Sequence, residues 1–338
     1  TVYDNLNKSL FEPVPIFVDS FGNFCLLNWQ FIYKGSIRDF YPPLNNVPNS
    51  KGDFQVYAEN LGHLDKEKQQ ELLNEIGSPI QPHELKNHID FAFLCLHGPG
   101  GEDGTIQGLF DYLKIPYSGS GVLASSIGIN KAVQKKMMVE AGFNSPLFYT
   151  IDRNDYITGK TKHLFAKAKD EIGFPLVIKP AHQGSSIGVS ILHEVEEETF
   201  MMAIEKAFFT RWLSIEEWTN KNETEKTEYI RQLADIREGI SLPIRILDGH
   251  LKECGIVHHP DKLIDVLDHI FTSEKEGVIL DALDAESTVL VEGFIEGKEF
   301  SCIVIQDEDG NPIALPPTEI IKGKELFDYR SKYLPGLS

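Results

Sequence analysis

KPAHQGSSIG, residues Lys179–Gly188, directly follows the short apolar run Phe174–Ile178. This order predicts a buried strand that ends in a lysine and continues into a flexible loop. Lysine is a point charge suited to phosphate, glycine lets the backbone come close, and backbone N–H groups and hydroxyls can surround anionic oxygens. The spacing is not GxxxxGK[ST], so this is not a Walker loop. The stretch therefore indicates a nucleotide triphosphate site beneath a lid.

The composition is that of an ordinary soluble protein: 338 residues, 41% hydrophobic and 25% charged. This length allows two or three domains. The formal net charge of −19 argues against nucleic acid or an anionic membrane as a partner. No apolar run approaches the roughly 20 residues that span a bilayer, and the first residues contain no signal-peptide core. These features predict a cytoplasmic protein with no membrane association.

The cysteines and a histidine pair provide no sign of a metal site. Four cysteines, Cys25, Cys95, Cys254 and Cys302, are scattered without C-x-x-C spacing, which predicts reduced, buried thiols. His258-His259 with Asp261 lacks a third ligand at a recognisable spacing, so a surface turn before Pro260 is expected.

The pattern of apolar residues predicts an α/β fold. Asp90–Leu96 is a continuous apolar run typical of a central parallel strand, and His97–Gly104 is a glycine-rich turn. Apolar residues then recur at helical spacing from Ile106 to Leu113. Such a unit places its loop at the carboxyl end of the strand, where α/β sheets bind ligands.

Other elements follow from the same patterns. A hairpin is expected around Gly22-Asn23, and a helix over Val122–Gly142 should break near Gly128. Residues 211–285 contain no assignable motif and predict an inserted helical and hairpin subdomain. Further helices are expected over Asp65–Ile76, Lys162–Ile172 and Glu194–Phe209, and further strands over Leu147–Ile151, Val289–Glu292 and Phe300–Gln306.

Six motifs occur in an order known from one enzyme family. They are His97–Gly108 (HGPGGEDGTIQG), Pro116–Gly121 (PYSGSG), Asn130–Met138 (NKAVQKKMM), Phe174–Ile191 (FPLVIKPAHQGSSIGVSI), Val291–Phe300 (VEGFIEGKEF) and Glu319–Tyr333 (EI…FDYRSKY). Together they resemble D-alanine–D-alanine ligases. The resemblance implies an ATP-grasp fold, in which an N-terminal Rossmann-like α/β lobe accompanies a central and a C-terminal lobe that sandwich ATP.

The resemblance also implies a domain division and a reaction. We expect an N-terminal lobe over residues 1–123, a central lobe with the lid over 124–210, a family-atypical insert over 211–285, and a C-terminal lobe from 286 to 338. In the implied reaction ATP phosphorylates one D-alanine, and the amine of a second D-alanine attacks the acyl phosphate to give D-alanyl-D-alanine for peptidoglycan. A homodimer is expected.

Several residues match the ATP-binding positions of the family. Lys131 and Lys179 match two nucleotide-phosphate lysines, and Ser186 of the lid is assigned to ATP with them. Glu292, Phe294 and Glu299 match the adenosine clamp, and the backbone after Glu292 is expected to read the adenine edge.

The substrate positions are matched by a second group. Ser185 and Tyr333 match a hydrogen-bonding pair that aligns the substrates, and Lys332 matches a lysine near the phosphates. His97 and Glu102 match the first D-alanine site. The Lys332-Tyr333 dipeptide resembles the residues at this position in dipeptide-forming ligases. Depsipeptide-forming D-lactate relatives tend to differ there.

The sequence also departs from the family pattern. It begins after the family's glycine-serine turn and ends at Ser338, before the acidic segment that binds two Mg²⁺ (or Mn²⁺) ions, so the metal ligands are expected beyond that residue. We interpret these two departures as a chain that is cut at both ends. Asn130 stands where an acidic residue is common, and Phe327 where a tyrosine is common.

Alternatives remain open. Taken alone, Glu102 and Asp103 indicate only helix N-terminal caps, and Glu292 and Glu299 only exposed strand-end carboxylates. His182 could contact phosphate or face solvent. For the whole chain, the alternatives are a related ligase with another amino or hydroxy acid as acceptor, and a catalytically silent nucleotide-binding module.

Overall fold

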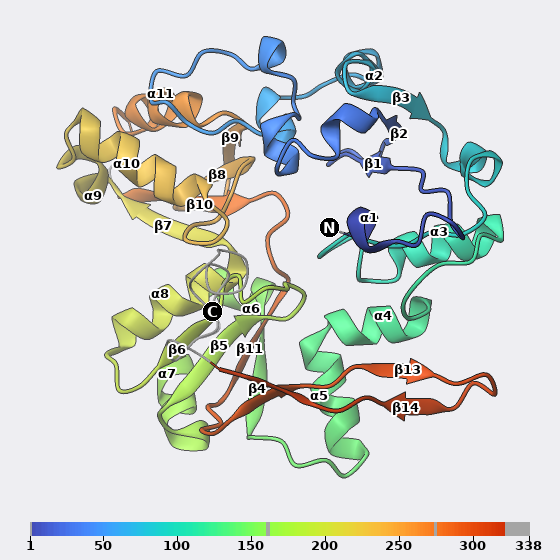
Figure 1. Cartoon of the computed structure of the whole chain (residues 1–338). Coiled ribbons are helices and arrows are strands. Elements are labelled where there is room, and N and C mark those ends of the chain that lie inside the picture. The colour runs from blue at the N-terminus through green and yellow to red at the C-terminus, as the bar shows by residue number, and fades with distance from the viewer. Residues whose placement is uncertain (1, 160–162, 274–275, 322–338) are drawn as a thin grey trace. The chain divides into compact units, whose positions relative to one another are not determined.

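The computed structural model describes residues 2–159, 163–273 and 276–321 (Figure 1). The chain forms two compact units, each built from two segments. Unit 1 combines Thr1–Ser126 with Thr210–Ala285, and unit 2 combines Ile127–Phe209 with the segment from Glu286 onward. The borders between units therefore fall at 126/127, 209/210 and 285/286. The predicted division into four domains stays a prediction.

The first segment of unit 1 begins with the predicted hairpin. Strands β1 (Ile16–Val18) and β2 (Phe24–Leu27) are antiparallel, and β3 (Gly77–Ile80) pairs with the other edge of β2. Asp19 holds the turn, because its Oδ1 accepts hydrogen bonds from the N–H groups of Phe21 and Asn23 at 3.0 and 2.8 Å. Asp65 caps helix α2 (Lys66–Asn74). The hairpin and the helix are confirmed.

The predicted central strand at Asp90–Leu96 is wrong. These residues form coil with a single parallel bridge between Ala92 and Tyr117. Ala92 donates to the carbonyl of Pro116 and accepts from the N–H of Ser118, but Leu94 donates to the Ser118 hydroxyl instead of to a ladder carbonyl. One bridge does not make a strand, and Phe91 and Phe93 are exposed. The helix that follows, α3 (Thr105–Leu113), is confirmed.

The second segment of unit 1 is a sheet covered by helices. Its four antiparallel strands have the order β7 (Thr210–Ser214), β10 (Gly277–Ala282), β8 (Ile244–Asp248) and β9 (Glu253–Val257). Trp218 is fully buried, and its indole N–H donates to Asp268 at 2.8 Å. The sequence predicted helices and a hairpin here but not a four-stranded sheet. The helices are α9 (Ile215–Thr219), α10 (Glu223–Ala234) and α11 (Pro260–Ile270).

The long helix predicted over Val122–Gly142 is two helices. Helix α4 spans Val122–Ile129 and helix α5 spans Lys131–Glu140. The break lies at Asn130 rather than at Gly128, because the Asn130 Oδ1 accepts from the N–H of Val133 at 3.0 Å and so caps α5. Gly142 follows α5 with φ 82°, a left-handed conformation that suits glycine.

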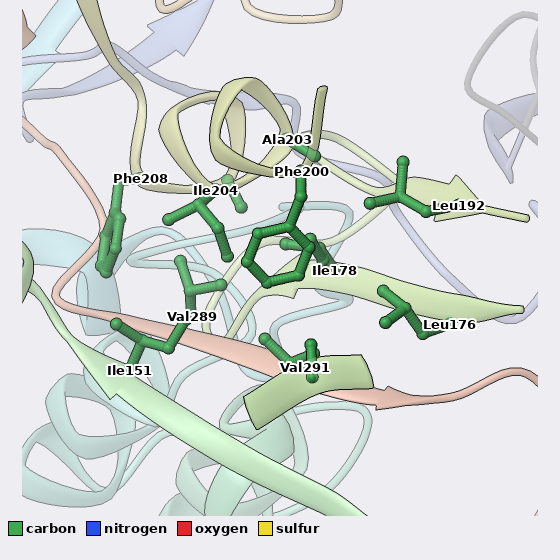
Figure 2. Close-up of a cluster of buried hydrophobic side chains, with 12 residues drawn as sticks. Ile151, Leu176, Ile178, Leu192, Phe200, Ala203, Ile204, Phe208, Val289 and Val291 are labelled. Atoms are coloured by element: carbon green, nitrogen blue, oxygen red, sulfur yellow. The ribbon is translucent and has the colours of Figure 1, made fainter. Parts of the chain in front are cut away.

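Unit 2 is built on a four-stranded antiparallel sheet. Its order is β4 (Phe148–Asp152), β11 (Thr288–Gly293), β5 (Leu176–Pro180) and β6 (Ser190–Leu192). Helix α8 (Glu197–Phe208) packs on one face of it. Figure 2 shows the core between them: Phe200, Ile204 and Phe208 of α8 point toward Ile178, Val289 and Val291 of the strands. This core fixes strands β5 and β11, which contain Lys179 and Glu292.

The remaining elements are short. Beyond β11, two antiparallel pairs join β12 (Glu299–Ser301) to β15 (Thr318–Ile320) and β13 (Val304–Gln306) to β14 (Pro312–Ala314). The strand predicted over Phe300–Gln306 is therefore two strands. The other helices are α1 (Val2–Asn5), α6 (Arg153–Ile157) and α7 (Leu164–Lys167), a π-helical turn covers Ala168–Ile172, and 3₁₀ turns cover Trp29–Phe31, Ile37–Asp39, Leu44–Asn46, Ala58–Leu61 and Pro82–Asn87. In the described part of the chain, no helix has the length and apolar character to cross a bilayer.

Candidate functional site

A buried carboxylate with two lysines lies on the sheet of unit 2. Lys179 on β5 and Glu292 on β11 are diagonal neighbours on the same face, since Lys179 is directly opposite Leu290. The Lys179 ammonium forms an ion pair and hydrogen bond with Glu292 Oε1. The Lys135 ammonium lies 2.5 Å from Oε2, and the Glu292 side chain is only 9% exposed. Two cations on one carboxylate leave a net positive charge at this place.

Lys135 is a site residue that the sequence reasoning missed. It lies on α5 one helical turn after Lys131, so the two lysines share a face of that helix. Its ammonium also donates to the Ser145 hydroxyl at 2.9 Å. The i, i+4 spacing of Lys131 and Lys135 could have identified it, but such a pair on a helix usually faces solvent.

The base of the lid, residues 181–183, is bound to the start of α5. The backbone N–H of Lys131 donates to the carbonyl of Ala181 at 3.0 Å. The Lys131 ammonium donates to the carbonyl of Gln183 and lies 3.5 Å from that of Ala181. Lys131 is therefore held at the foot of the lid, and its assignment to nucleotide phosphates stays a prediction.

His182 lies between those two carbonyl groups and faces protein, not only solvent. Its Nδ1 is 2.7 Å from Glu286 Oε1, and its backbone N–H donates to Glu286 Oε2 at 2.8 Å. Its Nε2 is 2.9 Å from the Nδ2 of Asn130.

The tip of the lid, residues 184–188, is a tight turn in an unusual conformation. Ser185 and Ser186 have φ of 52° and 60°, in the left-handed region that costs a non-glycine residue of the order of 1 kcal/mol. Gly188 has φ 73°. The N–H of Ile187 donates to the carbonyl of Gly184 at 3.1 Å. The two serines that the sequence assigns to substrate and ATP thus lie in a strained turn.

The glycine-rich loop of unit 1, residues 97–104, contains the other two predicted substrate residues, His97 and Glu102. Glu102 Oε2 accepts from the N–H of Gly98 at 2.6 Å. Asp103 accepts from the N–H groups of Gly100 and Thr105. Partial burial alone would raise the pKa of Asp103, but these hydrogen bonds outweigh it and hold the pKa below its ordinary value. Both carboxylates accept from backbone N–H groups, but only Asp103 reaches α3, through the N–H of Thr105, so Glu102 is not the helix cap of the simpler interpretation.

The backbone N–H groups just after Glu292 already have hydrogen-bond acceptors, and Glu299 lies on a different strand. The N–H of Gly293 donates to Leu147 and that of Phe294 to Pro175, each at 3.1 Å. Glu299 is exposed on β12. The predicted residues Lys332 and Tyr333, and the departure at Phe327, lie outside the described residues.

Neither histidines nor cysteines form a metal site in the ranges that the structure describes, where no three His, Cys, Asp or Glu residues could hold an ion. His259 caps α11, and Asp261 accepts from the N–H groups of Lys51 and Gly52. The cysteines are free thiols, but the prediction that they are buried holds only for Cys25; the other three are exposed. Burial, with a smaller effect of Asp19, raises the pKa of Cys25 to about 11.

Family models match most of the chain. The D-ala D-ala ligase N-terminus model matches residues 1–120, and the D-ala D-ala ligase C-terminus model matches residues 137–227 and 271–338. The chain belongs to the D-alanine–D-alanine ligase family. This confirms the resemblance carried by the six motifs. The second match leaves out residues 228–270, which include most of α10, the β8–β9 hairpin and α11.

Individual ligases support the assignment and the fold. A D-alanine–D-alanine ligase of Pelotomaculum thermopropionicum is 28% identical over 264 residues, which are 78% of this chain and 58% of that ligase. The ligase structure from Coxiella burnetii has a TM-score of 0.51 at 18% identity and covers 95% of this chain and 64% of its own. The VanG D-Ala:D-Ser ligase of Enterococcus faecalis has the same TM-score at 20% identity, covering 98% of this chain and 66% of its own.

Two conclusions follow from the ligase comparisons. The chain has the ATP-grasp fold of D-alanine–D-alanine ligases, so the predicted mixed α/β fold class is confirmed. The chain also spans less than two thirds of the length of the first curated ligases that it matches.

Proposed function

We propose that the protein is an ATP-dependent ligase that joins two D-alanine molecules through an acyl phosphate, giving D-alanyl-D-alanine for peptidoglycan. Family membership supports the proposal, and one structural observation carries it. Lys131 at the foot of the lid, and Lys135 and Lys179 around Glu292, concentrate positive charge in unit 2. A chain with a net charge of −19 needs such a local cluster to bind a nucleotide triphosphate.

Each residue then has a role in the proposal. Lys131 and Lys179 bind the phosphates, while Lys135 stays on Glu292 as its counter-ion. Glu292, Phe294 and Glu299 take the adenosine, and Ser186 acts from the lid. His97 and Glu102 face the first D-alanine, and Ser185, Lys332 and Tyr333 align the substrates. A closed lid would exclude water from the acyl phosphate.

The proposed reaction uses Mg²⁺ or Mn²⁺ to neutralise phosphate charge. Between residues 2 and 321, apart from the two undescribed gaps, no carboxylate set fits such an ion. We therefore derive no step from a metal. We further propose that the protein acts in the cytoplasm as a homodimer, with the four-part domain division given above.

The direct test is release of ADP by the full-length gene product, measured with a coupled assay with and without D-alanine. The proposal requires ADP release that depends on D-alanine and a dipeptide product in equal amount. ADP release independent of D-alanine would contradict the substrate. No nucleotide binding at all would contradict the ligase.

The identity of the second substrate needs its own test, because one structural neighbour is a D-Ala:D-Ser ligase. A panel of D-alanine, D-serine and D-lactate as second substrate separates a dipeptide ligase from its relatives. The proposal predicts the highest kcat/KM for D-alanine. A preference of tenfold or more for another acceptor, about 1.4 kcal/mol in transition-state free energy, would assign the related ligase instead.

A further inference from the structure

Successive residues of the lid base, 181–183, contact different partners. The carbonyl groups of Ala181 and Gln183 contact the Lys131 ammonium. His182, the residue between them, is directed to Asn130 and Glu286. The position of His182 therefore fixes the two carbonyl groups that hold Lys131.

The cap of α5 determines which nitrogen of His182 carries a proton. Asn130 Oδ1 accepts from the N–H of Val133, so the other end of its amide, Nδ2, faces His182. Because an amide NH₂ only donates, Nε2 of His182 must accept. The proton then lies on Nδ1 and is donated to Glu286 Oε1 at 2.7 Å. The imidazole is neutral in this arrangement.

Glu286 provides a rigid end for this chain of hydrogen bonds. Its side chain is 2% exposed. It accepts from the backbone N–H and the ring of His182, and also from the N–H groups of Ser287 and Thr288 at 2.9 and 3.3 Å. Thr288 begins β11 and its carbonyl accepts from Ala181 at 3.0 Å. Displacing His182 would leave a buried carboxylate without two of its donors, which is costly.

We propose that Asn130, His182 and Glu286 are positioning residues that hold the lid base, and with it the Lys131 ammonium, ready for a nucleotide phosphate. We call this set the lid-base clamp. The identity of the ligand rests on the proposed function, whereas the clamp exists without it. The clamp keeps residues 181–183 fixed at the foot of the lid.

The first test is ATP affinity of full-length variants by calorimetry. His182→Ala should weaken ATP binding about tenfold, because one hydrogen-bonded anchor of the Lys131 site is lost. His182→Asn should recover part of the affinity, since its amide can still donate to Glu286. His193→Ala, an exposed histidine in the same unit, is the matched control and should leave the affinity unchanged. Equal affinity of wild type and His182→Ala would overturn the inference.

The second test is ¹⁵N NMR of the His182 ring in the nucleotide-free protein at neutral pH. The clamp requires a protonated Nδ1 and an unprotonated Nε2. Asn130→Asp replaces the donor by a second carboxylate and should protonate both nitrogens. A wild-type ring with its proton on Nε2 would overturn the clamp. If the wild-type protein binds no ATP, the proposed function fails. The spectrum still shows whether the His182 ring is held as the clamp requires.

Discussion

The loop of residues 97–104 and the lid of residues 181–188 both follow an apolar run and both contain several glycines, but they are held in opposite ways. In the first, the carboxylates of Glu102 and Asp103 accept from N–H groups of the same loop. In the second, the contacts at the base come from residues distant in sequence, and His182 and Glu286 are 104 positions apart.

This difference shows that two glycine-rich loops can be held in place by different kinds of contact. The loop of residues 97–104 keeps its shape through its own carboxylates, Glu102 and Asp103, before any ligand binds. In the lid, the Lys131 ammonium of α5 lies on carbonyl groups of the lid base and can exchange those contacts for phosphate oxygens. The glycine content alone does not distinguish the two cases, whereas the hydrogen bonds do.

The largest expected effect comes from removing the lysine that precedes the lid. Lys179→Ala should weaken ATP binding by about 100-fold, because a charge-assisted hydrogen bond contributes roughly 1.5–3 kcal/mol. The fold should persist, since Glu292 keeps Lys135 as its partner. Calorimetry and circular dichroism check both statements, with the exposed Lys169→Ala as control. Unchanged ATP affinity would remove Lys179 from the site.

A pair of glycine substitutions sharpens the comparison of the two loops. Gly188→Ala places a Cβ 3.1 Å from Pro180 Cγ and 3.2 Å from Phe209 Cζ at φ 73°. Gly100→Ala has φ 82°, but its Cβ meets no described atom within 4 Å. Both changes cost about 1 kcal/mol of backbone strain, and crowding adds about 1 kcal/mol or more at Gly188.

The measurement for this pair is the unfolding midpoint in urea. Gly188→Ala should lower it more than Gly100→Ala, and only Gly188→Ala should also lower ATP affinity. The reverse order of stabilities would contradict the described lid conformation.

The smallest effect concerns the pH dependence of the loop at 97–104. The pKa of Asp103 is lower in the folded protein, so its stabilisation is present above the unfolded value of about 3.9 and is lost as the pH falls through the folded pKa. Asp103→Asn should lower the free energy of unfolding by up to about 1 kcal/mol at neutral pH. Below pH about 4 the difference from wild type should shrink. Urea titrations across this range measure it, with the exposed Asp170→Asn as control; a difference that grows in acid would refute the assignment.

The parts of the fold that were predictable have a strong local pattern. Helices α3 and α8 show apolar residues at helical spacing, and β5 and β11 are short apolar runs, so their residues alone identify them. The apolar run at Asp90–Leu96 gave the wrong answer because a strand also needs neighbours, and pairing partners are not a local property. The sheet of residues 210–285 was missed for the same reason.

Candidate site residues that belong to a sequence motif could be predicted. Residues whose role depends on a partner distant in the sequence could not. Motifs identify Lys131, Lys179 and Glu292 as candidates, and the structure pairs Lys179 with Glu292, while their roles stay predictions. Lys135 was missed because a lysine on a helix face gives no signal of the carboxylate that it will meet. His182 was left open because its partner Glu286 becomes adjacent only once β11 is in place.

The position of β11 between β4 and β5 has a consequence for synthesis. On the ribosome, β4, β5 and α8 emerge first, and all of residues 210–285 must be translated before the inner strand β11 appears. At ~5–20 residues per second this delay is about 4 to 15 s. During it the two strand edges that β11 will pair, one on β4 and one on β5, stay exposed, and Lys135 and Lys179 have no Glu292 to neutralise them. The half-built sheet is therefore the species that a chaperone would have to protect.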